Sequence, residues 1–353
     1  MAEALRVGVV GCGVIAKRYV EDSPAFENWR PIACADLDSA LAGAFGAEHG
    51  LRALPVDALI ADDEVELVLN LTPPRVHAAV VRAALDAGKH VYTEKPLAAT
   101  VEEARELVAQ ADVLGLRLGC APDTFLGSAY ETGRKLIADG KIGFPLGGAA
   151  TMLVGGPDSW HPNAEMFYRA GGGPLFDIAP YYLTAIVSLL GPIASVAGFA
   201  ETPTAERTLG AGPRAGETIV VDVPTHAAMV LQLRNSALVT MTVSFEARGQ
   251  YESGLVIYGI EGVLELPDAN GFGGEVVLRR AGDDARAVAY ADRGAQETRG
   301  LGIEELVEAL RAGRPHRASG ELALHVLEAA EAAAASADEL RSIALVTDAP
   351  LVV

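Results

Sequence analysis

Several parts of the sequence carry residue types at spacings that could support redox chemistry on a small molecule. Gly11-Cys12-Gly13-Val14-Ile15-Ala16 directly follows an apolar run and opens a helix-like segment. The first glycine makes a tight turn, the second lets backbone approach a pyrophosphate, and the small alanine permits close helix packing, while the helix N-terminus favours negative charge. We therefore predict a dinucleotide site formed by Gly11, Gly13, Val14 and Ile15.

An acidic residue stands where such a site would bind the ribose. Asp36 ends the second strand-like run, Asp38 follows it, and no arginine lies between Cys34 and Leu41. A carboxylate there accepts hydrogen bonds from ribose hydroxyls and repels a 2′-phosphate. The expected cofactor is therefore NAD rather than NADP. The alternative is a glycine turn that binds no nucleotide, although strand, turn, helix, second strand and acid occur here in order.

A lysine stands at the end of a later strand-like run, in Glu94-Lys95-Pro96. Proline disfavours the α conformation in the residue before it, so Lys95 is expected to be extended at the carboxyl end of the strand. Ligands of open α/β sheets bind at that edge. With its pKa lowered beside an oxidised nicotinamide, Lys95 could accept a proton in oxidation or donate one in reduction. The alternative is an exposed loop lysine.

The preceding strand-like run ends in Thr72-Pro73-Pro74-Arg75-Val76-His77. Thr72 and Pro73 are expected to line the cofactor, together with Glu94 of the lysine motif. His77 is either a further cofactor residue or a histidine on the surface of the helix that begins here.

The segment from Gly171 to Tyr181 opens with consecutive glycines and carries two candidate catalytic side chains. Pro174 suggests a helix start, which would place Asp177 and Tyr181, four residues apart, on one face. A carboxylate and a phenol so placed can hold and deprotonate a sugar hydroxyl. Pro180 would remove a helix hydrogen bond and kink the segment. The alternative is a structural Tyr–Asp pair.

The loop before these glycines is expected to lie near the substrate. Trp160 could stack on the apolar face of a sugar, and His161 or Arg169 could bind hydroxyls or an acid group. Tyr168 is a further candidate substrate residue. The alternative is a loop that packs on itself.

The spacing of apolar runs predicts two domains that position these residues. In the first, strands alternate with helices, which is typical of a parallel, doubly wound α/β sheet. In the second, an α+β domain, longer strands follow one another and indicate a mainly antiparallel sheet. We predict a Rossmann domain at 1–122 and a substrate-binding and oligomerisation domain at 123–353. The expected strands are 5–10, 31–35, 67–71, 90–93, 116–120, 145–154, 193–201, 226–234, 237–245, 253–259 and 262–266, the expected helices are 14–22, 39–48, 75–87, 100–114, 127–139, 174–190, 301–312 and 320–340, and the expected loops are 155–173 and 202–218.

Composition limits the classes of function. The 353 residues include 47 acidic and 28 basic side chains, a formal net charge of −19, which disfavours binding to nucleic acid and to anionic membranes. The three cysteines are too scattered for a disulfide framework, and none has metal-ligand spacing, so no metal is expected. Without a signal-like N-terminus or an uncharged stretch of membrane-spanning length, a cytoplasmic protein is expected.

In their order along the chain, these motifs resemble the Gfo/Idh/MocA oxidoreductase family. The resemblance implies a Rossmann domain, a second domain whose open sheet makes oligomer contacts in a homodimer or homotetramer, a catalytic lysine matched by Lys95 and a substrate-positioning acid matched by Asp177. Many members have histidine where this chain has Tyr181, which resembles the glucose-fructose oxidoreductase, dihydrodiol dehydrogenase and sugar ketoreductase branches. The 120–125 segment lacks the Asn and Arg often seen there, and Asp123 is its candidate substrate residue.

Together these features predict an NAD(H)-dependent oxidoreductase that transfers hydride between a nicotinamide and a hydroxyl or carbonyl carbon of a sugar, polyol or cyclitol. One alternative is a redox-neutral enzyme, a glycosidase or sugar–sugar oxidoreductase, that keeps NAD tightly bound. Another is a non-catalytic sugar or NAD sensor. The presence of Lys95, Asp177 and Tyr181 together argues against a sensor, which needs no proton-transfer groups.

Overall fold

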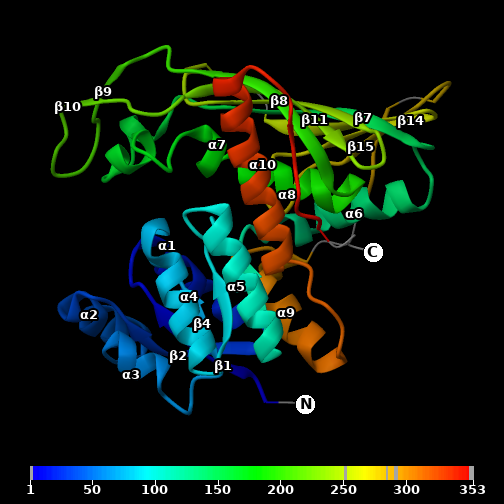
Figure 1. Ribbon diagram of the computed structural model, residues 1–353. Helices are drawn as coiled ribbons and strands as arrows, with labels where there is room; N and C mark the ends of the chain where they lie inside the picture. The colour runs from blue at the N-terminus through cyan, green and yellow to red at the C-terminus, as the bar shows by residue number, and fades with distance from the viewer. Residues whose placement is uncertain (1–2, 250–252, 284, 290–292, 350–353) are drawn as a thin grey trace. The chain divides into compact units, whose positions relative to one another are not determined.

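The computed structural model describes residues 3–249, 253–283, 285–289 and 293–349. Contacts divide the chain into two compact units (Figure 1). Unit 1 comprises Met1–Gly127 and Asp292–Leu324, and unit 2 comprises Ser128–Ala291 and His325–Val353. Helix α10 (Gly320–Glu339) therefore begins in unit 1 and ends in unit 2.

Unit 1 is built on a parallel sheet, which confirms the predicted doubly wound fold. Among the described residues the sheet has six strands in the order β3-β2-β1-β4-β5-β6, so the strand order reverses on either side of β1. Strand β4 is buried at every position, as expected for a strand covered by helices on both faces. The strands are β1 (Leu5–Val10), β2 (Trp29–Ala35), β3 (Arg52–Ala53), β4 (Leu67–Asn70), β5 (His90–Thr93) and β6 (Leu118–Cys120).

The helices of unit 1 begin and end at local signals. Thr100 caps α5 by accepting a hydrogen bond from the Glu103 N–H, and Gly115 ends it in the left-handed conformation. Strand β3 and helix α3 were not predicted because two and five residues are too short to show a period. The helices are α1 (Val14–Asp22), α2 (Ser39–His49), α3 (Val56–Ile60), α4 (His77–Asp86), α5 (Val101–Leu114) and α9 (Leu301–Ala312), with 3₁₀ turns η1 (Ser23–Ala25), η2 (Pro74–Val76), η3 (Thr124–Leu126) and η6 (Gly294–Gln296).

Helix α9 packs in unit 1, although the chain reaches it only after the strands of unit 2. At Gly300, just before α9, an added Cβ would lie 2.5 Å from the Trp29 ring. Glu304 accepts a hydrogen bond from the Asn28 backbone N–H at 3.1 Å. Unit 1 is therefore discontinuous in sequence. The assignment of cofactor binding to 1–122 and of substrate binding and oligomerisation to 123–353 stays a prediction.

Unit 2 is built on a mixed sheet that is mostly antiparallel, as predicted. Its described residues form nine strands in the order β16-β15-β14-β13-β7-β12-β11-β8-β17, in which only β12 and β7 pair in parallel. The strands are β7 (Pro145–Leu153), β8 (Ile193–Glu201), β11 (His226–Leu233), β12 (Leu238–Ser244), β13 (Gly254–Gly259), β14 (Gly262–Leu266), β15 (Val277–Arg280), β16 (Arg286–Ala287) and β17 (Ile343–Ala344).

Helices cover one face of this sheet. Burial alternates along β11, where Met229 and Leu231 are buried and Val230 is exposed. Gly133 of α6 (Ser128–Ala138) lies against β14, and the Ser336 hydroxyl of α10 accepts a hydrogen bond from a β8 backbone N–H at 3.0 Å. In Figure 1, α6 and α8 lie along the same side of the strands. On the opposite face, called the open face below, the described residues Ala228, Val230 and Gln232 of β11 are exposed.

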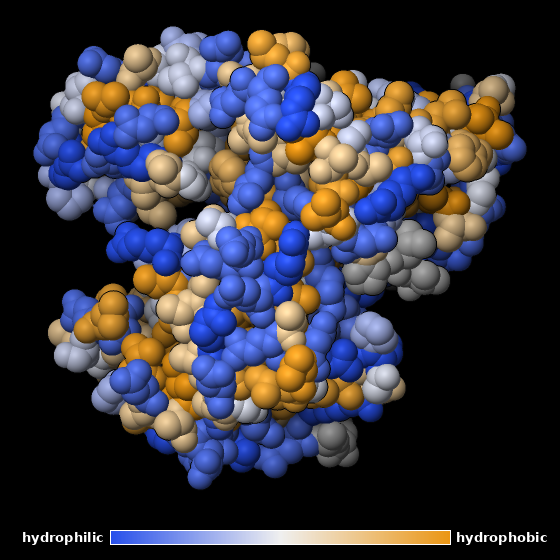
Figure 2. All heavy atoms as spheres, viewed as in Figure 1, coloured by the Kyte–Doolittle hydropathy of each residue, from blue (hydrophilic) through white to orange (hydrophobic). Residues whose placement is uncertain are grey.

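The open face displays apolar and small side chains in place of charges over its central strands. Phe199, Val230 and Leu238 are exposed on β8, β11 and β12, and Tyr258 is exposed on β13. Figure 2 shows apolar groups interspersed with polar ones over the strands of unit 2. An exposed apolar sheet face of this kind is typical of a protein–protein contact.

The predicted helix over 174–190 consists of two helices in the structure. Helix α7 (Pro174–Asp177) ends at Asp177, and α8 (Ala179–Leu190) begins after Ile178. Pro180 lies in the first turn of α8, where no intrahelical N–H bond is required. The expected kink inside a continuous helix was therefore wrong, since the chain starts a new helix there.

The segment predicted as a loop over 202–218 contains a small hairpin. Strands β9 (Glu206–Thr208) and β10 (Thr218–Val220) form a separate antiparallel pair. The other expected loop, 155–173, contains the 3₁₀ turns η4 (Pro157–Ser159) and η5 (Ala164–Tyr168). Strands of three residues give too short an alternation to be predicted.

The three cysteines, Cys12, Cys34 and Cys120, are buried with free thiols, and all belong to unit 1. Within the described ranges, no group of His, Cys, Asp and Glu side chains is arranged to hold a metal ion. No helix in the described part of the chain combines the length and apolar character needed to cross a membrane.

Candidate active site

The glycine turn joins β1 to α1 at the carboxyl edge of the unit 1 sheet. Gly11 has a φ of +97°, and a Cβ there would lie 2.7 Å from the Leu71 carbonyl oxygen, so both conformation and space require glycine. Gly13 precedes α1, and a Cβ there would meet nothing within 4 Å. Val14 and Ile15 form the first turn, with Val14 exposed. The open side at Gly13 fits a pyrophosphate at the helix N-terminus.

Asp36 lies beside this turn, directly after β2. Its carboxylate accepts hydrogen bonds from the Cys12 N–H at 2.9 Å and from the Asp38 N–H at 3.0 Å. Asp38 accepts from the backbone N–H groups of Ala40 and Leu41, and so caps α2. The glycine turn and the acid predicted to bind ribose are therefore joined by a direct hydrogen bond.

A buried polar network follows β4 and β5 at the same edge. The Asn70 side chain accepts a hydrogen bond from the Thr72 hydroxyl at 2.7 Å and donates one to the Thr93 hydroxyl at 3.1 Å. Both Asn70 and Thr93 are fully buried. The sequence analysis missed them, although a polar residue that ends an apolar strand is the signal that would have indicated them. This network fixes the backbone on which Thr72 and Pro73 lie.

His77 is buried, so the alternative of a surface histidine was wrong. Its Nε2 lies 2.7 Å from the Thr72 carbonyl oxygen, and its Nδ1 lies 2.6 Å from the Pro96 carbonyl oxygen. The imidazole therefore joins the segments that follow β4 and β5. In this position it supports the cofactor edge through the backbone, and direct contact of His77 with the cofactor stays a prediction.

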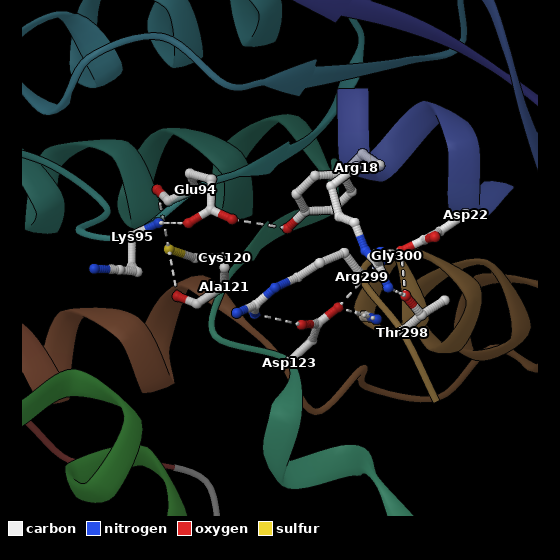
Figure 3. A network of polar contacts seen from close by, with 12 residues as sticks. Arg18, Asp22, Glu94, Lys95, Cys120, Ala121, Asp123, Thr298, Arg299 and Gly300 are labelled. Carbon is white, nitrogen blue, oxygen red and sulfur yellow. Dashed lines mark hydrogen bonds and ion pairs between the residues drawn. The ribbon is translucent and has the colours of Figure 1, made fainter. Parts of the chain in front are cut away.

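Lys95 lies two residues beyond the end of β5, at the carboxyl edge as predicted. Its backbone N–H donates to the Glu94 carboxylate at 3.1 Å, and Glu94 also accepts from the Tyr19 hydroxyl at 3.0 Å. Figure 3 shows the Lys95 side chain extending away from the carboxylates of Glu94 and Asp123. Glu94 thus orients the backbone of the lysine, while the ammonium is directed elsewhere.

Asp123 serves the start of α9 in the structure. It is completely buried, and one carboxylate oxygen accepts from the backbone N–H groups of Gly300 and Gly302 at 3.2 and 3.0 Å. The other oxygen lies 3.4 Å from the Arg299 guanidinium (Figure 3). Burial raises the pKa of this carboxyl group, and Arg299 opposes the shift. These contacts give Asp123 a structural task, and contact with substrate stays a prediction.

In unit 2 the consecutive glycines tie the helix that carries Asp177 to the preceding loop. The Gly173 N–H donates to the Phe167 carbonyl at 2.7 Å. Gly173 has a φ of +79°, and a Cβ there would lie 2.7 Å from the Pro224 carbonyl oxygen. Asp177 ends α7 and Tyr181 lies in the first turn of α8, both half-buried. These two candidates therefore flank a helix junction rather than sharing one continuous helix.

Residues 155–173, called the aromatic loop below, carry a ring cluster that reaches the surface. Trp160 is 66% exposed and lies edge-on to His161 at 5.4 Å, and His161 lies edge-on to Phe167 at 5.0 Å. The His161 Nδ1 accepts a hydrogen bond from the Asn163 N–H at 3.1 Å, which favours the tautomer that carries its proton on Nε2. We call Trp160, His161 and Phe167 the platform, because they could stack against a sugar and donate to its hydroxyls.

Two other predicted substrate residues of the aromatic loop have partners within unit 2. Tyr168 is buried, and its hydroxyl donates to the Asp158 carboxylate; burial, followed by this hydrogen bond, raises the pKa of the phenol. Arg169 forms ion pairs with Glu165, at 2.5 Å, and with Asp222. The Arg169 charge is therefore already compensated. These contacts bear out the alternative of a loop that packs on itself for this pair, and their contact with substrate stays a prediction.

Comparison with known families agrees with this fold and geometry. Residues 5–121 match the model described as oxidoreductase family, NAD-binding Rossmann fold, and residues 130–265 match the GFO/IDH/MocA C-terminal domain. The chain therefore belongs to the Gfo/Idh/MocA oxidoreductase family. This result confirms the resemblance, the two-part fold and the NAD-binding class of unit 1.

Similar proteins include reductases of modified sugars. A dTDP-3,4-didehydro-2,6-dideoxy-alpha-D-glucose 3-reductase of Streptomyces antibioticus is 35% identical over 55% of this chain. A 1,5-anhydro-D-fructose reductase of Ensifer adhaerens is 31% identical over 49% of this chain. The chain spans only 59% and 53% of the lengths of these two relatives. A solved structure of levoglucosan dehydrogenase with NADH and L-sorbose superposes with a TM-score of 0.85 at 24% identity, covering 97% of this chain and 99% of that one, which shows the shared fold.

Proposed function

We propose that the chain is an NAD(H)-dependent oxidoreductase that acts on a hydroxyl or carbonyl carbon of a sugar, polyol or cyclitol. The observation that carries the proposal is the arrangement at the carboxyl edge of the unit 1 sheet. There the open Gly13 backbone precedes a helix N-terminus, Asp36 is bonded to the same turn, and Lys95 follows β5. The sugar reductases among the relatives support the substrate class.

Gly11, Gly13 and Asp36 would hold the nucleotide, and Thr72 and Pro73 would line it. The nicotinamide, when bound, supplies the hydride acceptor or donor. A carbon that loses hydride must also lose the proton of its hydroxyl, and Lys95 is the group proposed to take it. In unit 2, Asp177 would orient the hydroxyl as an acceptor, and the Tyr181 phenol would donate or accept a proton.

The preference for NAD over NADP follows from Asp36. Its carboxylate is held in place by two backbone N–H groups, so it cannot turn away from a 2′-phosphate without losing both. Repulsion between the two anions would weaken NADP binding.

The open face of the unit 2 sheet supports a homodimer or homotetramer. A sheet face with exposed Phe199, Val230, Leu238 and Tyr258 and few charges would lose apolar area from water when it meets a second copy of itself. The chain would act in the cytoplasm without nucleic-acid or membrane partners. Sedimentation of the wild type and of Val230→Lys would test the contact, since a buried lysine opposing its copy favours the monomer.

The activity is tested by measuring NADH formation against a panel of aldoses, deoxysugars, anhydrosugars and cyclitols. Oxidation of at least one class with NAD, and weaker activity with NADP, is expected. The purified protein should first be examined for bound NAD. A stoichiometric cofactor that never exchanges, with no net NADH released, would contradict a freely exchanging dehydrogenase and favour a redox-neutral enzyme.

A further inference from the structure

A buried arginine lies behind the aromatic loop and is not used by the proposed chemistry. Arg207 belongs to β9, and its side chain is 1% exposed. A two-stranded hairpin is marginally stable alone, and burial of a guanidinium is unfavourable unless carboxylates pair with it. The position of Arg207 therefore depends on its partners outside the hairpin.

Those partners come from separate segments of unit 2. The Arg207 Nη2 lies 2.5 Å from the Glu246 carboxylate, just beyond β12, and its Nη1 lies 3.5 Å from the Asp158 carboxylate in the aromatic loop. Its guanidinium carbon lies 5.5 Å from the centroid of the Tyr168 ring, within the range of a cation–π contact. Arg207 thus joins the end of a sheet strand to two points of the aromatic loop.

These two points are next to the platform in sequence. Asp158 lies two residues before Trp160, and Tyr168 directly follows Phe167. The hairpin backbone adds contacts, since the Gly210 N–H donates to the Asp158 carbonyl at 2.8 Å and the Asp222 N–H donates to the Tyr168 carbonyl at 2.9 Å. The segment that carries the platform is therefore held at both ends, by Asp158 and by Tyr168, and both of these residues contact Arg207.

Stability alone does not account for an arginine at this place. Among the described residues, the Nε and Nη1 atoms of Arg207 have no hydrogen-bond acceptor although both are buried. Unsatisfied donors cost folding free energy, and well-packed apolar residues often replace a buried ion pair without loss of stability. The Arg207 guanidinium pairs with carboxylates from two different segments, and this does fix how those two segments are arranged relative to each other.

We infer that Arg207 is a positioning residue for the platform. Through Asp158 and Tyr168 it holds Trp160 and the His161–Phe167 pair in one orientation before substrate binds, so that a sugar meets a preformed surface. The inference rests on the proposed function, because it takes the platform to be a sugar-binding surface. It concerns substrate affinity rather than the proton and hydride transfers.

The test compares Arg207→Met with Arg207→Lys, and uses Arg279→Met as a matched control. Arg279 is an exposed arginine on β15 that pairs with Glu265, away from the aromatic loop in sequence. Loss of preorganised stacking should raise the KM for the best sugar about tenfold in Arg207→Met and change kcat much less, since the reacting groups are untouched. Arg207→Lys should recover part of the affinity, and Arg279→Met should leave KM unchanged.

A second readout follows the platform directly and needs no activity. The chain has two tryptophans, of which Trp29 is 1% exposed and Trp160 is 66% exposed, so acrylamide quenching of fluorescence reports mainly on Trp160. Arg207→Met should change both the quenching constant and the emission maximum, while Arg279→Met should not. If Arg207→Met does not fold, Asp158→Asn removes the same anchor with a smaller change and should give the same two shifts.

Unchanged KM and unchanged Trp160 quenching in a folded Arg207→Met protein would overturn the inference. A change in quenching without any sugar turnover in the wild type would support the positioning role and refute the proposed function. A normal KM in Trp160→Ala, together with wild-type sugar turnover, would show that the platform is not a substrate surface, and would overturn the inference while the proposed function stands.

Discussion

The carboxyl edge of unit 1 and the aromatic loop of unit 2 both carry candidate site residues, but different contacts hold them. At the edge, Asp36 and His77 bond to backbone groups of neighbouring segments. In the aromatic loop, Tyr168 and Arg169 bond to side-chain carboxylates, and Arg207 pairs with Asp158. Every residue offers a backbone group, whereas a side-chain partner has to be one particular residue.

This difference predicts how each of the two regions responds to amino-acid substitution. A residue that bonds to backbone keeps its partner whatever side chains surround it, so the contacts of Asp36 and His77 should persist through many substitutions. The aromatic loop depends on a few ionised side chains, and a single substitution at one of them removes an anchor. We therefore expect cofactor binding to resist substitution and substrate affinity to respond to it.

The largest expected effect belongs to the edge. Lys95→Met should lower kcat by about 10²–10⁴-fold, the usual contribution of a general acid–base group, while NADH affinity stays near that of the wild type. Single-turnover rates and NADH titration by fluorescence measure the two quantities. Lys141→Met, at an exposed lysine, is the matched control. Near-normal turnover would return Lys95 to an ordinary loop residue.

In unit 2, the two candidates at the helix junction should separate in their kinetics. Tyr181→Phe should lower kcat by about 10²-fold with little change in KM, because only a proton-transfer interaction is lost. Asp177→Asn should raise KM as well, since an orienting acceptor acts before the chemistry and during it. Tyr258→Phe, on the sheet, is the control. If Tyr181→Phe kept the wild-type rate, Lys95 would be the sole acid–base group.

A smaller effect is expected at Asp36, which is proposed to bind the cofactor and not to take part in proton transfer. Asp36→Asn should weaken NAD binding about tenfold, because hydrogen bonds to a charged acceptor contribute about 1.5–3 kcal/mol and the amide keeps one acceptor. Affinity for NADP should improve relative to NAD as the repulsion falls. Calorimetric titration with both cofactors measures the ratio, with Asp57→Asn as the control. NADP binding as tight as NAD in the wild type would contradict the assignment of Asp36.

The smallest expected effect concerns the stability of unit 2 against acid. Burial lowers the pKa of His325, whose Nε2 accepts from the Ile193 N–H at 2.9 Å. A lowered folded-state pKa means that the neutral imidazole stabilises the fold fully above the unfolded value of about 6.5, and that this contribution is lost as the pH falls below it. The slope for one group is at most about 1.4 kcal/mol per pH unit.

Urea unfolding of the wild type and of His325→Gln between about pH 5 and pH 8 checks this expectation, since the window spans the unfolded-state pKa. The variant should show a flatter dependence of the unfolding free energy on pH. An unchanged slope in His325→Gln would mean that the loss of stability at low pH comes from another group, such as buried His316 of unit 1.

The sequence predicted the edge of unit 1 well because its signals are local. The glycine turn, Asp36 and Lys95 each end a strand, and the parallel sheet brings those ends to one side whatever lies between them. For His77 the sequence left open a cofactor residue or a surface histidine, and its burial was not predicted because its second partner, the Pro96 carbonyl, lies beyond a whole helix and strand.

In unit 2 the sequence indicated the strands but not what holds the aromatic loop. Tyr168 and Arg169 are residue types suited to sugar binding. No local sequence pattern shows that Tyr168 is bonded to Asp158 and Arg169 to Asp222. Arg207 gave no signal because it lies in a strand of three residues, within a segment that reads as a loop. Partners that far apart are set by tertiary packing, which a local pattern does not encode.

The buried cysteines allow local opening of unit 1 to be measured by thiol labelling. Thiols react as exposed thiolates, so an alkylating reagent would modify Cys12, Cys34 or Cys120 only after unit 1 opens around them. Unit 2 contains no cysteine, so the reagent would not label it. The rate of labelling would therefore report the opening of unit 1 alone. A bound dinucleotide should lower this rate by the factor by which it favours the closed state over the open one.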